Sequence, residues 1–411
     1  MKFFYCIIIL FSTSVLKSDK NDIVSDNFFR VEKQYSIMLK AANDLQQFPK
    51  TINKDGSICF TGIGDWTCGF WPGCLWQVFE YSKEDNWKQE AIKWTESLEK
   101  NQYNTESHDI GFVMNCSYGN AFRLTGNVKY KNILVQSAKS LVTRFNPKVG
   151  ALKSWNIFKS WNGKSVYQYP VIIDNMMNLE LLFNVYRITG DSLYRNVAIK
   201  HAETTMKNHY RDDFSSYHVI CYDPETGKVL SKETAQGFSD NSAWARGQAW
   251  GLYGFTMVYR ETKDMKYLLH ARFIADFYLS KMETVKGNIP FWDFNVNQLG
   301  FTPNWRYEKN KFSEVPHDAS AAAIISSALF ELSTYVEEDT KKKYFNAAYE
   351  ILKALSSDYY RAELGTNGNF LLKHSVGSIP HNAEIDVPLI YADYYFLEAL
   401  LRYEKISKNK K

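Results

Sequence analysis

The chain has 411 residues, of which 45% are hydrophobic and 23% are charged, proportions typical of a soluble globular protein. Its formal net charge is only +4, and its lysines and arginines form no stripe or nucleic-acid motif, so we exclude a nucleic-acid partner. The length is large for one domain, although closed barrels often reach it as a single unit.

The first residues are typical of a targeting segment. Lys2 is the charged start, Phe3–Leu10 is an apolar run, and small polar residues follow at 12–14. The run is too short to span a membrane, so we expect a secretory signal over residues 1–20, with an approximate end, and a single catalytic domain over 21–411. The signal predicts export across the inner membrane to the periplasm. Cys6 lies inside the apolar run and not after it, which disfavours a lipid anchor, and we expect no stable membrane association.

Five cysteines remain outside this segment, an odd number without zinc-binding spacing. They are Cys59, Cys68, Cys74, Cys116 and Cys221. A Cys68–Cys74 disulfide is one alternative in an oxidising compartment. The favoured interpretation is a set of buried free thiols.

Hydrophobic periodicity indicates two kinds of helix that alternate along the chain. Helices of the first kind have one apolar and one charged face, and they cover Asn27–Leu45, Trp87–Lys100, Tyr130–Arg144, Tyr194–Asn208, Tyr267–Met282 and Tyr344–Ser357. Helices of the second kind are apolar on all sides, and they cover Gly69–Tyr81, Ile110–Leu124, Met176–Ile188, Gly247–Arg260, Ala319–Tyr335 and Asp386–Tyr403. A helix that is apolar on all sides is buried on all sides.

Short polar turns join each buried helix to the exposed helix that follows it. In Thr125-Gly126-Asn127 and Thr189-Gly190-Asp191 the glycine suits a helix C-cap, and the Asn or Asp suits the next N-cap. Such turns connect antiparallel neighbours. The pattern predicts an all-α fold, an (α/α)6 barrel of six inner and six outer helices that closes by packing the first helix beside the last. Repeats alone would also permit an open superhelix, but the last helix is not a polar cap.

The long loops precede inner helices, notably residues 146–172, 210–245 and 285–317. Because all inner helices run in one direction, these loops meet at one end of the barrel, where we expect the site. The second loop is predicted to contain a small β-hairpin, Ser216–Tyr222 and Lys228–Glu233. Aromatic residues make up 16% of the chain, and those that do not fill the core would suit stacking on sugar rings.

Acidic residues begin several inner helices, namely Asp109, Asp174, Asp318, Glu384 and Asp386. Asp is a good N-cap, so capping alone is one interpretation of each. The alternative is that carboxylates converge on one pocket beside Arg246 and His218, as glycoside hydrolysis requires. The helix N-termini and Arg246 would suit an anionic substrate, but they lower the pKa of an Asp. Burial or a second carboxylate must therefore raise the pKa of a general acid there.

His218 has an equally weighted alternative, a hairpin residue whose hydrogen bonds are satisfied. The chain has no G-x-S-x-G elbow, HExxH motif, phosphate loop or dinucleotide fingerprint. We therefore expect a hydrolase that uses no metal and no cofactor.

Several strings resemble glycoside hydrolase family 88, the unsaturated glucuronyl hydrolases, in order along nearly the whole mature chain. They are Gly69-Phe70-Trp71-Pro72-Gly73, His108-Asp109-Ile110-Gly111-Phe112, Ile173-Asp174-Asn175-Met176-Met177-Asn178, Ser216-Tyr217-His218-Val219, Thr234-Ala235-Gln236-Gly237, Ser242-Ala243-Trp244-Ala245-Arg246-Gly247-Gln248-Ala249-Trp250-Gly251, Asp318-Ala319-Ser320-Ala321-Ala322 and Tyr391-Ala392-Asp393-Tyr394-Tyr395 with the five residues after it. The Arg-Gly-Gln-Ala-Trp-Gly string is the specific one.

The resemblance implies that Asp174 is the general acid/base and Asp109 its essential partner. In that family the enzyme hydrates the C4=C5 double bond of a terminal unsaturated uronic acid, and the hemiketal then falls apart. The implied partner is an unsaturated oligosaccharide made by a polysaccharide lyase. By the same resemblance His218, Gln236, Arg246 and Trp250 are substrate-binding residues, and Trp71 and Trp161 are weaker aromatic candidates.

Two alternatives stay open at this point. One keeps the barrel but changes the substrate, as in hydrolases of unsaturated rhamnogalacturonan fragments or inverting glycosidases. The other is a glycan-binding protein without catalysis. The sulfation preference is also open: Lys373, His374 and Ser375 either contact a sulfate or belong to a surface loop.

Overall fold

The structure is a computed structural model that describes residues 22–283 and 285–408. The predicted secretory signal, residues 1–20, lies outside the described residues. Within these ranges, none of the helices combines the length and the apolar character that crossing a membrane requires.

The outer layer consists of amphipathic helices. They are α1 (Asp22–Ala41), α3 (Asp85–Glu96), α6 (Val128–Val142), α8 (Ser192–Asn208), α10 (Met265–Met282) and α12 (Glu338–Leu355). In α12, for example, Tyr344, Ala348 and Ile351 are buried at helical spacing. The predicted outer helices are all present, with ends shifted by a few residues.

The inner layer consists of helices in which more than half of the residues are buried. They are α2 (Phe70–Ser82), the interrupted helix α4–η2–α5 (Ile110–Met114, Asn115–Gly119 and Asn120–Thr125), α7 (Asn175–Thr189), α9 (Ala245–Thr262), α11 (Ala319–Ser333) and α13 (Ile390–Lys408). The second of them was predicted as one continuous helix. A turn of π-helix, η2, interrupts it, and such a turn leaves little mark on apolar spacing.

The predicted start of the last inner helix, Asp386, was wrong. The helix begins at Ile390, and residues Ala383–Val387 form strand β11, in which Glu384 and Asp386 have positive φ. Pro388 explains the difference, because the residue before a proline is restricted to extended conformations.

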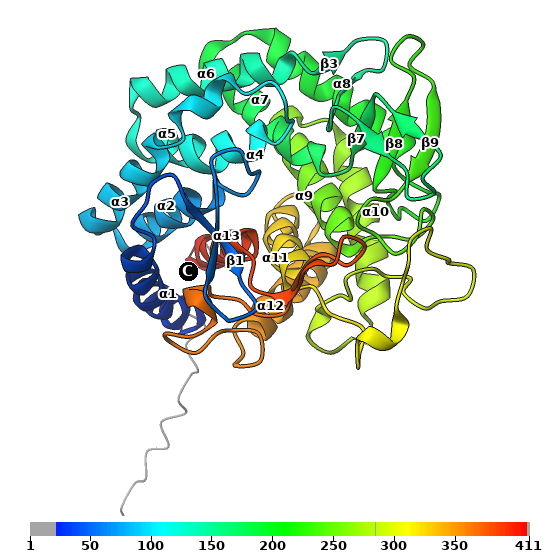
Figure 1. Ribbon diagram of the computed structural model, residues 1–411. Coiled ribbons are helices and arrows are strands. Elements are labelled where there is room, and N and C mark those ends of the chain that lie inside the picture. Colours follow the sequence, from blue (N-terminus) through cyan, green and yellow to red (C-terminus); the bar gives the residue numbers. More distant parts are fainter. Residues whose placement is uncertain (1–21, 284, 409–411) are drawn as a thin grey trace, which may run out of the picture.

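The inner helices form a closed ring (Figure 1). In sequence order each inner helix contacts the next, from α2 through α4–η2, α7, α9 and α11 to α13, and α13 contacts α2. Helix α1 also packs against both α2 and α13, so the first helix lies beside the last. The predicted (α/α)6 barrel is confirmed, and the open superhelix is excluded.

Cap geometry reproduces the predicted turns. Gly126 and Gly190 adopt the left-handed conformation at helix C-caps, with φ of 68° and 74°. Asn127, Asp191 and Asp264 cap α6, α8 and α10, each accepting a hydrogen bond from the backbone amide two residues later. These short turns keep one end of the barrel compact.

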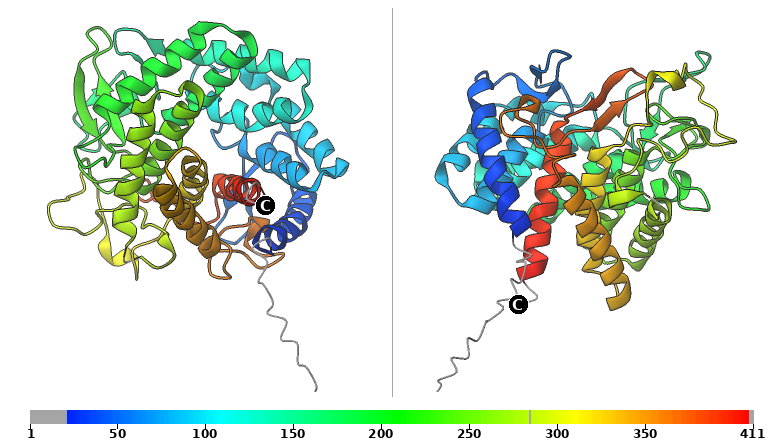
Figure 2. Two further views of the ribbon diagram at one scale, coloured as in Figure 1. Left: turned by 180° about the vertical axis from the view of Figure 1, so that it is seen from behind. Right: turned by 90° about the horizontal axis from the view of Figure 1, so that it is seen from below.

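The long connections gather at the other end, as the right-hand view of Figure 2 shows. They contain short strands: β1 (Phe48–Ile52), β2 (Ile58–Thr61), β3 (Phe145–Asn146), β4 (Ala151–Leu152), β5 (Phe158–Lys159), β6 (Val166–Tyr167), β7 (Pro170–Ile172), β8 (Val219–Tyr222), β9 (Val229–Glu233), β10 (Ser375–Ser378) and β11. The predicted hairpin is present as β8–β9, and β7 pairs with β8 to make a three-stranded sheet. Single turns of 3-10 helix, η1 (Glu99–Tyr103), η3 (Lys286–Asn288), η4 (Lys309–Lys311) and η5 (Asn367–Asn369), complete these loops.

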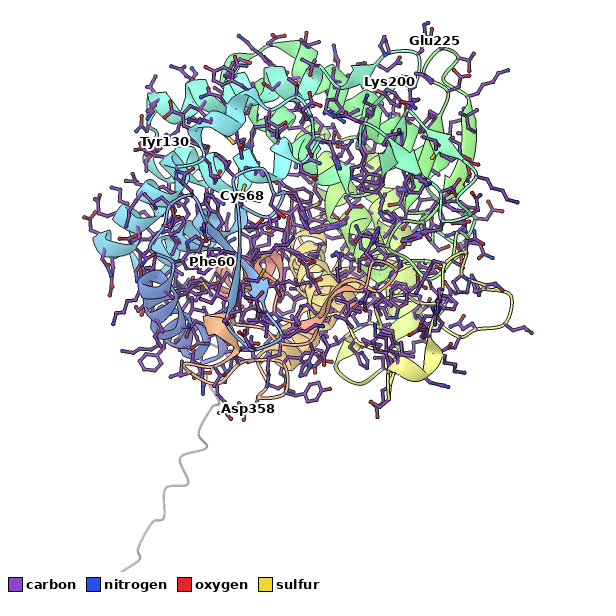
Figure 3. All side chains as sticks on the ribbon, in the orientation of Figure 1. Phe60, Cys68, Tyr130, Lys200, Glu225 and Asp358 are labelled. Carbon is purple, nitrogen blue, oxygen red and sulfur yellow. The ribbon has the colours of Figure 1, made fainter. Side chains whose placement is uncertain are left out.

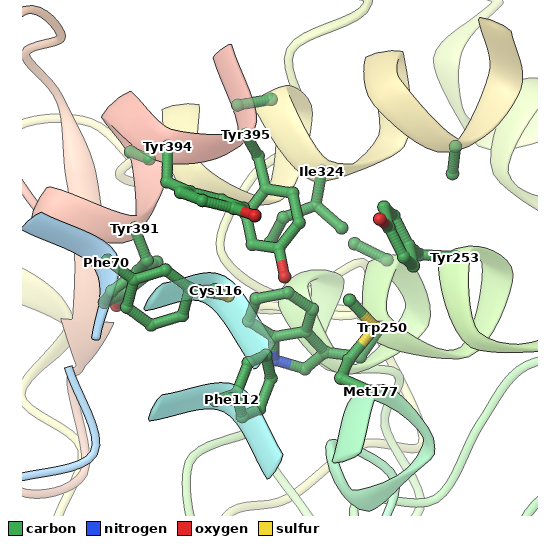
Figure 4. Close-up of a cluster of buried hydrophobic side chains, with 14 of the residues drawn as sticks. Phe70, Phe112, Cys116, Met177, Trp250, Tyr253, Ile324, Tyr391, Tyr394 and Tyr395 are labelled. Carbon is green, nitrogen blue, oxygen red and sulfur yellow. The ribbon is translucent and has the colours of Figure 1, made fainter. Parts of the chain in front are cut away.

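Aromatic side chains from opposite sides of the ring meet in its centre (Figure 4). Trp250 of α9 packs edge-on against Phe112 of α4 and Tyr395 of α13, with ring centroids 5.2 and 5.4 Å apart. Charged side chains such as Lys200, Glu225 and Asp358 lie at the periphery instead (Figure 3). The centre of the barrel is therefore a packed core of aromatic side chains.

The cysteines within residues 22–408 that the structure describes are unpaired. Cys59, Cys68, Cys74, Cys116 and Cys221 are free thiols, and all except Cys59 are buried. Burial raises the pKa of the Cys68 and Cys74 thiols well above the ordinary value, so they stay protonated. The favoured interpretation from the sequence is confirmed, and the Cys68–Cys74 disulfide is not formed.

Ion pairs inside the ring hold the inner helices together. Arg260 of α9 and Arg402 of α13 both contact Glu331 of α11, at 3.1 and 2.8 Å. Burial raises the pKa of Glu331, but these two guanidinium groups outweigh it and lower the pKa below the usual value. Because the pairs are buried, removing one partner would leave an uncompensated charge.

Gly111 sits where the second and third inner helices come closest. A Cβ at this position would lie 2.5 Å from the Cα, the Cβ and Oδ1 of Asn178. We expect Gly111→Ala to lower the free energy of unfolding by about 1–3 kcal/mol, because α4 must move away from α7. Urea unfolding measures this, with Gly62→Ala as the control, since nothing lies within 4 Å of a Cβ there. Equal stability of the two variants would contradict the close contact.

Candidate active site

Two of the acidic residues that begin inner helices do not cap them. Asp109 and Asp174 occupy the N-cap positions of α4 and α7, but neither side chain accepts a hydrogen bond from its helix. Asp318 differs, because its carboxylate accepts from the amide of Ser320 and caps α11. Capping is therefore the right interpretation for Asp318, whereas the carboxyls of Asp109 and Asp174 remain available for chemistry.

Asp174 is buried at the barrel mouth. The residue is 9% exposed, and its Oδ2 atom has no hydrogen-bond partner among the described residues. Burial raises the pKa of Asp174 to about 7, while the charge of Arg246 lowers it and Asp109 raises it further. Burial thus outweighs the positive field that the sequence predicted, and the carboxyl can hold a proton near neutral pH.

His218 faces Asp174 from the residue before strand β8. Its Nδ1 accepts hydrogen bonds from the backbone amides of Ala235 and Gln236, both at 3.1 Å. The ring hydrogen must therefore be on Nε2, which lies 3.7 Å from Asp174 Oδ2. Burial, together with the charge of Arg246, lowers the pKa of His218 well below its usual value, so the ring is a neutral donor.

Asp109 lies between a hydroxyl and a second histidine. Ser107 donates a hydrogen bond to its Oδ2 at 2.9 Å, and His108 Nε2 lies 3.3 Å from its Oδ1. The side chain is 18% exposed. It borders a cavity of about 230 Å³, whose lining includes Trp66 and Asn104. Asp109 is thus the more open of the two carboxyls.

Arg246 is buried and largely occupied by the protein itself. Its Nη1 donates to Asp318 at 3.2 Å and to the carbonyl of Val376, and its Nη2 donates to Gln236 at 2.8 Å and to the carbonyl of Gly377 at 2.6 Å. Both terminal nitrogens of Arg246, which were predicted to bind a substrate carboxylate, therefore already donate hydrogen bonds within the protein. Arg246 instead fixes the Gln236 side chain, which is half-buried, and contributes positive charge beside Asp174.

The three predicted tryptophans lie in different surroundings. Trp161 is half-exposed at the mouth, where its indole donates to the carbonyl of Ala235 at 3.2 Å and its ring lies 4.9 Å from His381. Trp250 is fully buried under the mouth and lowers the pKa of Asp174, so it borders that carboxyl but has no open face for stacking. Trp71 is also fully buried, packed against Tyr35 and Trp94 of the outer layer. The structure does not support a substrate contact for Trp71.

Other aromatic residues at the mouth were not predicted as site residues. Trp244 lies 4.5 Å from the His218 ring and 4.4 Å from the Arg246 guanidinium, and Trp155 lies 6.1 Å from His218. The rings of Trp66 and Tyr391 lie 4.9 Å apart at a tilt of 38°. Trp66 and Trp244 both lie in segments that lead into inner helices, and this shared position is the sequence signal that could have identified them.

The predicted sulfate-contacting alternative at residues 373–375 is not favoured. Lys373 donates to the carbonyl of Asp358 at 2.8 Å, and His374 pairs with the exposed Asp386 at 2.6 Å. Ser375 is fully buried. Within the described ranges, no three His, Cys, Asp or Glu side chains are grouped so that they could hold a metal ion.

Comparisons with known proteins agree with this geometry. The model of Glycosyl Hydrolase Family 88 matches residues 39–301. The unsaturated glucuronyl hydrolase of Formosa agariphila is 40% identical over 392 residues, which are 95% of this chain and 92% of that protein. The unsaturated chondroitin disaccharide hydrolase of Streptococcus agalactiae is 35% identical over 83% of this chain and 82% of that protein.

Solved structures share the whole fold. The crystal structure of an unsaturated glucuronyl hydrolase specific for heparin has a TM-score of 0.86 and 46% identity, and the match covers 94% of this chain and 98% of that chain. An aspartate-to-asparagine variant of the Streptococcus agalactiae enzyme complexed with dGlcA-GalNAc6S has a TM-score of 0.75 and 30% identity over 93% of this chain and 92% of that chain. The chain therefore belongs to glycoside hydrolase family 88, the family that its sequence motifs resemble.

Proposed function

We propose that this enzyme removes a 4,5-unsaturated uronic acid from the non-reducing end of oligosaccharides that polysaccharide lyases produce. The observation that carries the proposal is the buried carboxyl of Asp174, which caps no helix and whose pKa is raised to about 7. A carboxyl that holds its proton near neutral pH suits general acid catalysis. Family membership supports the same chemistry.

The reaction is a hydration that uses Asp174 twice. Asp174 transfers its proton to C4 of the vinyl ether, and positive charge develops at C5. Water adds to C5, and its proton returns to the Asp174 carboxylate. The hemiketal then opens, and the sugar leaves as an open-chain keto acid while the shortened saccharide regains its hydroxyl. One water is consumed, and Asp174 ends as it began.

The surroundings of Asp174 suit both halves of this cycle. After the first proton transfer the carboxylate faces the Nε2–H group of His218, whose nitrogen lies 3.7 Å from Oδ2, and it lies near the charge of Arg246. Both stabilise the anion until water gives back a proton. His218 cannot compete as the acid, because its pKa is lowered well below the usual range. We propose that Asp109, at the start of the neighbouring inner helix α4, helps to orient the water and the sugar.

The substrate class that we propose is an unsaturated glycosaminoglycan disaccharide. Relatives named for chondroitin disaccharides and for heparin support this class. The half-exposed Trp161 and the exposed His381 lie beside Gln236, and we propose that this side of the mouth receives the saccharide that leaves.

An absorbance assay tests the function. Chondroitin, hyaluronan and heparin are digested with lyases, the purified protein is added, and the ultraviolet absorbance of the conjugated uronate is followed. We expect the absorbance to decline with at least one of the disaccharides. If the protein turned over unsaturated rhamnogalacturonan fragments and none of these disaccharides, the alternative of a rhamnogalacturonan-fragment hydrolase would be favoured. Binding without turnover across the panel, in a folded protein, would favour a non-catalytic glycan-binding protein.

The aromatic platform at Trp161 gives a prediction about affinity. We expect Trp161→Ala to raise KM by about threefold to tenfold, the loss of one aromatic contact worth about 0.5–1.5 kcal/mol, with little change in kcat. Steady-state kinetics on the preferred disaccharide measures both constants. The control is Tyr103→Ala, because Tyr103 is 67% exposed. A fall in kcat without a rise in KM would contradict a role in binding.

We also propose that residues 1–20 direct export to the periplasm. The support is the charged start and the short apolar run. Cell fractionation with N-terminal sequencing of the mature protein tests this, and recovery of the uncleaved chain in the cytoplasm would contradict it.

A further inference from the structure

Asn178 connects the helices that carry the two carboxyls. It lies on α7, one helical turn after Asp174, and it is fully buried. Its Oδ1 accepts a hydrogen bond from the backbone amide of Phe112 in α4 at 2.8 Å. Its Nδ2 contacts Nδ1 of His108 at 3.1 Å and Oδ1 of Asn175 at 3.3 Å.

These contacts determine which nitrogen of His108 carries the hydrogen. The Phe112 amide can only donate, so the oxygen of the Asn178 side chain must face it. The NH2 group of Asn178 then faces His108 Nδ1, which must present its lone pair. The hydrogen of the neutral ring is therefore on Nε2, the atom that lies 3.3 Å from Asp109 Oδ1.

The same arrangement occurs at the other carboxyl. His218 receives two backbone amide hydrogens on Nδ1 and presents Nε2 to Asp174. Each carboxyl of the site thus faces the Nε2 hydrogen of a buried histidine. At His218 backbone amides face Nδ1, whereas at His108 the Asn178 side chain faces Nδ1.

We propose that Asn178 is a positioning residue for the reaction: it fixes His108 as the Nε2–H tautomer and thereby keeps a neutral donor beside Asp109. This inference rests on the proposed function, in which Asp109 takes part. A donor on Nδ1 also prevents protonation of that nitrogen, so His108 cannot become a cation while Asn178 holds it. Burial favours the neutral ring as well, because it lowers the pKa of His108.

The tautomer can be measured without any substrate. Two-dimensional long-range 1H–15N spectra distinguish the ring nitrogens of a histidine, and the His108 signals among the eight histidines are identified by their loss in His108→Gln. For the wild-type enzyme we expect a protonated Nε2 and an unprotonated Nδ1. A protonated Nδ1 would overturn the proposal, whether or not the enzyme turns over the proposed substrate.

Asn178→Asp replaces the donor that faces His108 Nδ1 with an acceptor, while the side chain keeps nearly the same shape. The new carboxylate keeps an acceptor for the Phe112 amide but presents an acceptor, not a donor, to His108 Nδ1. At pH 8 we expect Nδ1 to become protonated and kcat to fall about 100-fold, with a smaller change in KM. The wrong tautomer would then turn a lone pair toward Asp109.

The matched control is Asn184→Asp on the same helix. Asn184 is half-buried and contacts Asn115 and Arg187, more than two turns beyond Asn175. We expect its kcat to stay within about twofold of the wild-type value. An unchanged His108 spectrum in Asn178→Asp, or a changed spectrum with unchanged kcat, would overturn the proposal. If Asn178→Asp does not fold, the wild-type spectrum alone decides.

Discussion

Asp174→Asn is expected to lower kcat by about 1000-fold, within the range that a positioned general acid contributes. The amide has the shape of the carboxyl but can neither give a proton to C4 nor take one from water. Because Asp174 does not cap α7 and its Oδ2 bonds to no described residue, the substitution removes no helix cap and no hydrogen bond of that oxygen. Substrate binding should survive, so the loss should appear in kcat and not in KM.

The pH profile of the wild-type enzyme should report the same group. The proposed acid acts in its protonated form, and its pKa is raised to about 7. We therefore expect kcat/KM to be level below about pH 7 and to fall about tenfold for each pH unit above it. Burial makes the largest contribution to this pKa shift. The pH at which activity begins to fall should therefore lie well above the pKa of an ordinary Asp.

Asp264→Asn provides the matched control for both measurements. Asp264 caps α10 on the surface, and Asn caps helices about as well as Asp. We expect wild-type activity and an unchanged pH profile from it. Near-wild-type turnover by Asp174→Asn would contradict the assignment of the acid and would direct attention to Asp109.

The barrel could be predicted from the sequence because its information is local. Apolar spacing identified the helices, and Gly126, Gly190, Asn127 and Asp191 marked their ends. The prediction of the start of α13 was wrong, because two local rules, the N-cap preference of Asp and the backbone restriction before Pro, compete there. Asp386 resembles an N-cap, but Pro388 keeps Val387 out of the helical conformation, and α13 begins only at Ile390.

The site could be predicted only in part, because its key properties depend on distant contacts. Asp109, Asp174 and Asp318 look alike in sequence, and only the folded structure separates the two carboxyls that cap no helix from the one that does. Arg246 was predicted to grip a substrate anion. Its guanidinium instead donates hydrogen bonds to Asp318 and to the carbonyls of Val376 and Gly377. These acceptors lie far from Arg246 in the sequence, and no sequence spacing indicates that they contact it.

The burial that adapts Asp174 to catalysis must also lower the stability of the fold. A carboxyl whose pKa is near 3.8 in the unfolded chain and about 7 in the folded protein binds its proton more tightly in the folded state. Between these values the unfolded chain loses the proton first, so the free energy of unfolding decreases as pH rises. Above about pH 7 both states are ionised, and the full cost of a buried charge is present.

We therefore expect Asp174→Asn to be more stable than the wild-type enzyme at pH 8, by at most about 4 kcal/mol at roughly 1.4 kcal/mol per pKa unit. The amide does not ionise, so the difference should shrink as pH falls from 7 toward 4. Urea unfolding at pH 5 and pH 8 measures it, and Asp264→Asn should show no such gain, because the hydrogen bond from the Lys266 amide keeps the pKa of Asp264 below its usual value. A constant difference between the two pH values would mean that the amide changes packing and not ionisation. A gain that grows with pH, in a variant that no longer turns over substrate, would show that the same desolvated carboxyl supplies the acid and weakens the fold.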